Sequence, residues 1–149
     1  MAEGGPRWPE GASIEALNAR SAGTLMEALG IEFTELGDTY LRATMQVDAR
    51  THQPYGLLHG GASVALAETL GSSAGMLMAG GNAVVGLEIN ANHLRAVRSG
   101  RVTGTARPIH VGRSTQVWEI RIEDEAGKPV CISRLTLSVL PQPPASGRS

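Results

Sequence analysis

The chain has 149 residues, of which 42% are hydrophobic and 18% charged, and its formal net charge is −1. This size predicts one domain with a substantial core, and the charge argues against a general binder of nucleic acid or membrane surfaces. Aromatic residues make up only 3% of the chain, so base-stacking platforms are not expected. The single cysteine, Cys131, cannot form an internal disulfide, which is typical of a reducing cytoplasm.

Both ends of the chain are rich in glycine or proline. Residues 1–12 contain no apolar segment of the secretory type and are expected to form a disordered leader, with Trp8 as a candidate to pack against the domain. Residues 141–149 are expected to form a disordered tail. A single domain over 13–140 remains, and we expect it to be cytoplasmic.

Two short helices are predicted first. Ser13 can cap a helix that carries Ile14 and Leu17. Thr24 and Glu27 have the spacing of a capping box for a second helix, which ends at Gly30.

Six extended segments are predicted. Alternation of apolar and polar residues over 39–47 is typical of a sheet with one dry face, and turn residues bound the other segments. The predicted strands cover 31–36, 39–47, 84–93, 100–109, 114–123 and 129–140.

A long apolar helix is predicted over 60–79, between the second and third strands. Its only side chain that ionises at neutral pH is Glu68, and four glycines together with this acid argue against a membrane span. Six strands and one long helix predict an α+β fold in which an antiparallel sheet curls round the helix.

Glu68 has two interpretations. It is either a carboxylate on the wetter side of its helix, or one held in an apolar pocket with a raised pKa, able to act as a base or a nucleophile. Ser72 lies one turn further along the same face.

The segment His59, Gly60 and Gly61 precedes this helix. It either forms a tight turn or presents the free N–H groups of a helix start, which can polarise a carbonyl. Gly60 and Glu68 are eight residues apart, about 12 Å along a helix, too far to act on one carbonyl. If both act on one substrate, a two-fold dimer with antiparallel helices must bring them together.

A local basic region lies between residues 89 and 118. It contains five arginines, two histidines and no acid, which suits a phosphate-bearing ligand, although a solvated basic face is the alternative. The four histidines of the chain are not spaced like metal ligands, so no metal is expected, and neither a GxSxG elbow nor a P-loop occurs.

Three stretches carry a resemblance to a family: DARTHQPYGLLHGGASVALAETLGSSAG, VVGLEINANH and ARPIHVGR. From about residue 31 to 140 the sequence resembles hotdog-fold acyl-CoA thioesterases. The nearest groups are the 1,4-dihydroxy-2-naphthoyl-CoA hydrolases, the enterobactin proofreading thioesterases and the 4-hydroxybenzoyl-CoA thioesterases with Glu on the central helix. The resemblance implies a six-stranded antiparallel sheet round one helix, assembled as a homodimer and further as a dimer of dimers.

The resemblance also implies roles for individual residues. Glu68 matches the catalytic carboxylate, and Gly60 matches the amide that polarises the thioester carbonyl. Gln53 and His59 match neighbours that orient carbonyl and water, and Ser72 a residue against the water or the acyl ring. Coenzyme A would be held at positions matching Gly86, His93, Leu94, Arg95, Ala96, His110, Val111, Gly112, Arg113 and Ser114.

The expected activity is hydrolysis of an acyl-CoA thioester, with an aromatic acyl group and no cofactor beyond the coenzyme A of the substrate. Tyr55 stands where the family pattern suggests Phe, which bears on acyl selectivity. Two alternatives remain: a non-catalytic acyl-CoA binding or sensing module, and a hotdog 3-hydroxyacyl dehydratase. Residue identity leaves open whether Glu68 is nucleophile or base, and which acyl group is the substrate.

Overall fold

The computed structural model of this chain describes residues 8–141, so the expectations for 1–7 and 142–149 lie outside the described residues. Its elements are α1 (Ile14–Ala19), α2 (Leu25–Leu29), β1 (Glu32–Leu36), β2 (Leu41–Gln46), α3 (Gly60–Leu77), β3 (Val84–His93), β4 (Arg101–Val111), β5 (Thr115–Glu123) and β6 (Pro129–Val139). Each predicted strand and helix is present, with bounds that differ by a few residues at most.

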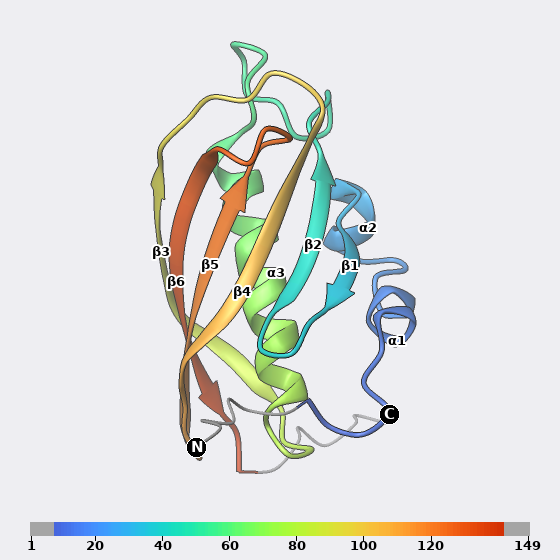
Figure 1. The fold of residues 1–149 in the computed structure, drawn as a ribbon, viewed down its shortest axis with the longest axis vertical. Coiled ribbons are helices and arrows are strands. Elements are labelled where there is room, and N and C mark those ends of the chain that lie inside the picture. The colour runs from blue at the N-terminus through green and yellow to red at the C-terminus, as the bar shows by residue number, and fades with distance from the viewer. Residues whose placement is uncertain (1–7, 142–149) are drawn as a thin grey trace, which may run out of the picture.

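The six strands form one antiparallel sheet in the order β1-β2-β4-β5-β6-β3. Helix α3 lies along the inner face of this sheet and contacts β2 through β6 (Figure 1). The expected sheet curled round one helix is therefore confirmed. Apolar side chains from alternate strand positions and from one face of α3 fill the space between the two layers.

Small residues let α3 approach the sheet closely. A Cβ added to Gly71 would lie 2.6 Å from Leu135 Cδ2, and one added to Gly75 would collide with Leu137. The opposite face of α3 is only half-buried, at Ala65 and Ser72 for example. This face is less buried because the sheet covers only the other side of α3.

The short helices begin and end as their capping residues predict. The Ser13 hydroxyl accepts from Ala16 N at 3.1 Å, and Gly30 ends α2 in the left-handed conformation at φ 68°. The Glu27 carboxylate accepts from Gly23 N at 2.6 Å. In a capping box the Glu27 carboxylate would accept from the N–H of the N-cap residue Thr24. Here it accepts from the residue before, so this half of the predicted capping box is shifted by one residue.

Trp8, within the segment expected to be a disordered leader, packs against the domain. Its ring stacks on Trp118, with ring centroids 6.2 Å apart, and its indole N–H donates to Gly37 O at 2.5 Å.

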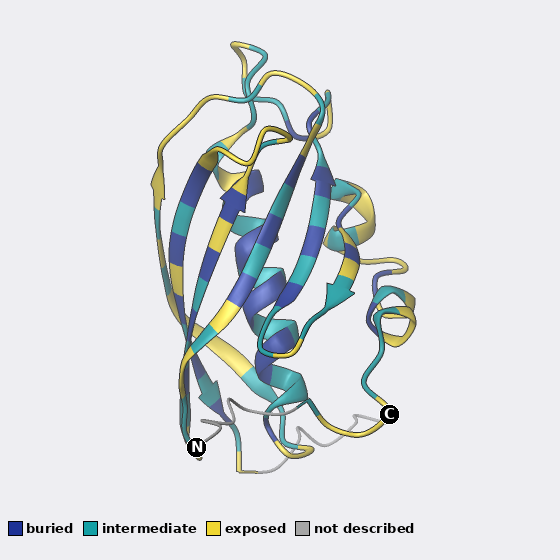
Figure 2. Ribbon diagram, viewed as in Figure 1, coloured by how far each residue is buried: buried dark blue, intermediate teal, exposed yellow. Residues whose placement is uncertain are grey.

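The two edges of the sheet differ. At β1, the Asn18 side chain accepts from Phe33 N at 2.8 Å and donates to Phe33 O at 2.9 Å, so α1 covers the backbone groups of this edge. At β3 no described segment covers the edge, and Figure 2 shows most of this strand exposed. Leu87, the extra residue of a β-bulge in β3, is 64% exposed. An uncovered edge with an exposed leucine is suited to pairing with another chain.

Candidate active site

Among the described residues, one backbone donor at the start of α3 has no acceptor and can bind a ligand. His59 is the N-cap residue, and its Nδ1 accepts from Gly61 N at 2.8 Å. The His59 carbonyl accepts from Ala62 N at 3.0 Å and from Ser63 N at 3.2 Å. Gly60 is the first helical residue, so its own N–H has no acceptor within the helix. This N–H, at the positive end of the helix dipole, is suited to polarising a carbonyl.

A cavity of about 360 Å³ lies beside Gly60. The His93 imidazole packs directly on this glycine, because a Cβ added to Gly60 would lie 2.9 Å from His93 Nε2. Six of the predicted site residues line this cavity: Gln53, Gly60, His93, Leu94, Arg95 and Ala96. Residues predicted for catalysis and for coenzyme A binding therefore lie around one cavity. They come from the loop before α3, the first turn of α3 and the end of β3.

Gln53 is held in a tight loop before α3. Its backbone N–H donates to Leu57 O at 2.8 Å, and its side-chain oxygen accepts from Tyr55 N. With the amide oxygen engaged, the side-chain NH₂ remains as a donor at the cavity.

Glu68 lies on the half-buried face of α3, two turns beyond Gly60. The enclosed apolar surroundings expected for its carboxylate are therefore incomplete in a single chain. A Cβ added to Gly86 of β3 would collide with Glu68 Oε1, so this glycine leaves room for the carboxylate. Gly86, predicted to hold coenzyme A, thus borders the catalytic candidate and not the cavity at Gly60.

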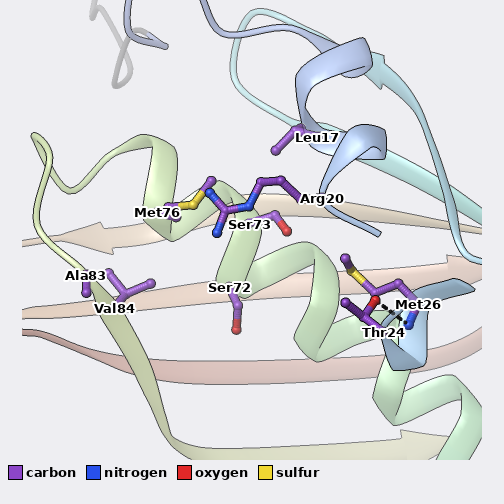
Figure 3. A pocket seen from close by; sticks show the side chains of 9 residues that line it. All are labelled: Leu17, Arg20, Thr24, Met26, Ser72, Ser73, Met76, Ala83 and Val84. Atoms are coloured by element: carbon purple, nitrogen blue, oxygen red, sulfur yellow. Dashed lines mark hydrogen bonds between the residues drawn. The ribbon is translucent and has the colours of Figure 1, made fainter. Parts of the chain in front are cut away.

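Two further cavities lie along this face of α3. One of about 380 Å³ is lined by Glu68, Ser72 and Ser73 together with the α2 residues Leu25 and Met26. The other, of about 390 Å³, shares Met26, Ser72 and Ser73 with it (Figure 3). Ser72 therefore lies where the two cavities meet.

The remaining predicted coenzyme A residues lie at the other end of the sheet. His110, Val111, Gly112, Arg113 and Ser114 form the β4–β5 hairpin. Gln116, next to this hairpin, donates to Gly75 O near the end of α3, whereas His93 contacts Gly60 at its start. One chain therefore does not bring 110–114 and 93–96 together.

Three further features of the described residues concern metal ligands, the cysteine and helix length. No three His, Cys, Asp or Glu side chains within 8–141 gather as a metal would require. Burial raises the pKa of the Cys131 thiol, which keeps it protonated at neutral pH and makes it a poor nucleophile. Within the same range, no helix combines the length and apolarity that a membrane span needs.

Sequence reasoning missed some residues that line these cavities. Ser63 lines the cavity at Gly60, and its position three residues further along the helix, on the same face, was an available signal. Arg20 lines a cavity with Ser72, but no local pattern links these two positions because they lie 52 residues apart in the sequence.

The curled sheet, the free donor at the start of α3 and the carboxylate on the same helix define a hotdog thioesterase. Residues 55–131 match the model of the thioesterase superfamily. The chain belongs to this superfamily and is a thioester hydrolase.

Named relatives cover nearly all of the domain. The chain is 60% identical over 134 residues to the proofreading thioesterase EntH of Cronobacter turicensis, covering 89% of this chain and 98% of the relative. It is 54% identical over 134 residues to the 1,4-dihydroxy-2-naphthoyl-CoA hydrolase of Escherichia coli, with the same coverage. A crystal structure of a mutant thioesterase from Pseudomonas aeruginosa superimposes with a TM-score of 0.88 at 53% identity, covering 89% of this chain and 97% of that one.

Proposed function

We propose that the protein hydrolyses aromatic acyl-CoA thioesters in the cytoplasm, releasing the free acid and coenzyme A without a further cofactor. The observation that carries the proposal is the free Gly60 N–H at the start of the same helix that carries Glu68. A relative of this chain is named for hydrolysis of 1,4-dihydroxy-2-naphthoyl-CoA, an aromatic acyl-CoA.

The thioester carbonyl oxygen accepts a hydrogen bond from Gly60 N–H, and the helix dipole stabilises the negative charge that develops on it. Glu68 takes a proton from a water that adds to the carbonyl carbon, or itself adds to that carbon. In either case the C–S bond breaks and the coenzyme A thiolate leaves, to be protonated. If Glu68 is the nucleophile, the acyl group stays on its carboxylate as a mixed anhydride, and a water then hydrolyses this anhydride to release the acid and restore Glu68. Gln53 and His59 orient the carbonyl and the water, and Ser72 borders the acyl group.

Glu68 and Gly60 act on one substrate only if they come from different subunits, because they are about 12 Å apart along α3. Pairing of two β3 edges about a two-fold axis makes the two α3 helices antiparallel and completes two sites per homodimer. The uncovered β3 edge and the position of Glu68 against Gly86 support this arrangement. Two such dimers then form a dimer of dimers.

Assembly of subunits also brings together the two segments predicted to bind coenzyme A, which lie apart in one chain. The segment 93–96 and the hairpin 110–114 carry Arg95 and Arg113, which suit the phosphates of coenzyme A. Their positions at opposite ends of one chain support a site to which more than one subunit contributes residues.

The test is Glu68→Gln, which keeps the shape of the side chain and removes its charge. With benzoyl-CoA and 4-hydroxybenzoyl-CoA, followed by release of free thiol, kcat is expected to fall about 10²-fold or more. Glu123→Gln, at an exposed glutamate of β5, is the matched control and is expected to retain activity.

Glu68→Gln activity within a few-fold of the parent would reject the catalytic role. Tight coenzyme A binding by the parent protein without thiol release would favour the binding module. Loss of water from a 3-hydroxyacyl-CoA would favour the dehydratase.

A further inference from the structure

The cavity beyond Ser72 contains one cation. Arg20, the C-cap residue of α1, extends over α3 near Ser73 and Met76 (Figure 3). The other residues that line this cavity are apolar or carry hydroxyl groups: Leu17, Thr24, Met26, Ser72, Ser73, Met76, Ala83 and Val84. Binding sites of this composition hold an apolar group and orient it through a few polar contacts.

Arg20 is an exposed residue, and its guanidinium forms no ion pair with another described residue. The ion pairs found among residues 8–141 are Arg42–Glu35, Arg50–Asp48 and Arg121–Glu119. No acid lines the cavity of Arg20 either. Its five N–H donors are thus available to a ligand that brings its own acceptor oxygen.

The cavity of Arg20 continues the cavity of Glu68. Both are lined by Met26, Ser72 and Ser73, and α2 borders both of them. Ser73 is five residues beyond Glu68, about 7.5 Å along the helix axis. The shared lining gives an aromatic acyl group whose thioester carbon lies at Glu68 a path along α3 towards Arg20.

We infer that Arg20 is a specificity-determining residue that binds an acceptor oxygen at the far end of the acyl group, either a carboxylate or a hydroxyl. This inference rests on the proposed function, because the thioester must lie at Glu68 for the far end to reach Arg20. Arg20 is expected to bind a carboxylate more tightly than a hydroxyl, since a guanidinium binds a carboxylate through two parallel hydrogen bonds.

The experiment compares three substrates that differ only at the far end of the ring: benzoyl-CoA, 4-hydroxybenzoyl-CoA and 4-carboxybenzoyl-CoA. Arg20→Gln is expected to lower kcat/KM about tenfold for 4-carboxybenzoyl-CoA and several-fold for 4-hydroxybenzoyl-CoA. For benzoyl-CoA, kcat/KM is expected to change less than about twofold. Arg20→Lys, which keeps the charge without the planar fork, is expected to give intermediate values. Arg121→Gln, at an exposed arginine of β5, is the matched control and leaves all three unchanged.

A second measurement separates binding from turnover. In the Glu68→Gln background, binding is measured by calorimetry. There Arg20→Gln is expected to raise the Kd of 4-carboxybenzoyl-CoA about tenfold and to leave the Kd of benzoyl-CoA unchanged. If Arg20→Gln lowered kcat/KM equally for all three substrates, or for none of them, the proposed role of Arg20 would be overturned. If the parent hydrolyses benzoyl-CoA and Arg20→Gln shows no selectivity, this inference alone fails. If the parent hydrolyses none of the three and the calorimetry shows no dependence on Arg20, the proposed function and this inference fail together.

Discussion

Gly86 leaves room for the Glu68 carboxylate because it has no side chain. A Cβ at this residue would meet the end of the Glu68 side chain and little else. Because that end is flexible, an added methyl group displaces the carboxylate more readily than it displaces β3. We therefore expect Gly86 to act through Glu68, and the coenzyme A contact that the family resemblance implies for it stays a prediction.

At this residue scale, Gly86→Ala is expected to lower kcat about tenfold or more while changing the free energy of unfolding by less than about 1 kcal/mol. The measurements are thiol release and urea unfolding. In the Glu68→Gln background the same substitution is expected to have no further effect on kcat, because the two residues act as a unit. Additive losses in the double variant would show that Gly86 acts independently of Glu68.

At the scale of elements, the two edge strands are protected in different ways. The Asn18 side chain bonds to both backbone groups of Phe33, so α1 ends the sheet at β1. Strand β3 has no such cover from residues 8–141 and exposes both Val85 and Leu87. A long uncovered edge is a liability in a monomer, and pairing with a second copy removes it.

Asn18→Ala leaves the Phe33 N–H and C=O without their partner and is expected to lower the free energy of unfolding by about 1–2 kcal/mol. Chemical denaturation monitored by circular dichroism measures this change. Glu15→Ala, at an exposed position on the same helix, is the control and is expected to stay within about 0.5 kcal/mol of the parent. Equal stability of the two variants would show that the Asn18 amide does not stabilise the β1 edge.

For the whole molecule, the proposed composite site makes activity depend on assembly. Leu87→Asp places a charge at the bulge of β3 and is expected to produce monomers without activity, because neither subunit alone completes a site. Light scattering and thiol release measured on the same samples test both effects. Leu87→Met keeps an apolar side chain there and is expected to leave assembly and activity intact. An active monomer would contradict the composite site.

Local pattern was enough to predict most of the elements. Turn residues around 80–82, 112–114 and 124–127 bound strands that pair within a few residues of their predicted ends. The bulge at Leu87 and the Glu27 bond to Gly23 were not predicted, because each depends on geometry that alternation and capping rules do not encode. The sequence also left open whether Glu68 lies on a wetter face of α3, because composition shows that a helix is apolar but not which neighbour covers each face.

The sequence by itself determined the α+β architecture and a long apolar helix that has a glycine-rich start and carries a single acid. These features depend on spacing along the chain, which fixes how far apart Gly60 and Glu68 lie on one helix. Only the tertiary structure decided that His93 packs on Gly60, that Gly86 leaves room for Glu68 and that Arg20 borders Ser72. Such contacts join segments distant in sequence, and the packing of the whole sheet against α3 determines which side chains meet.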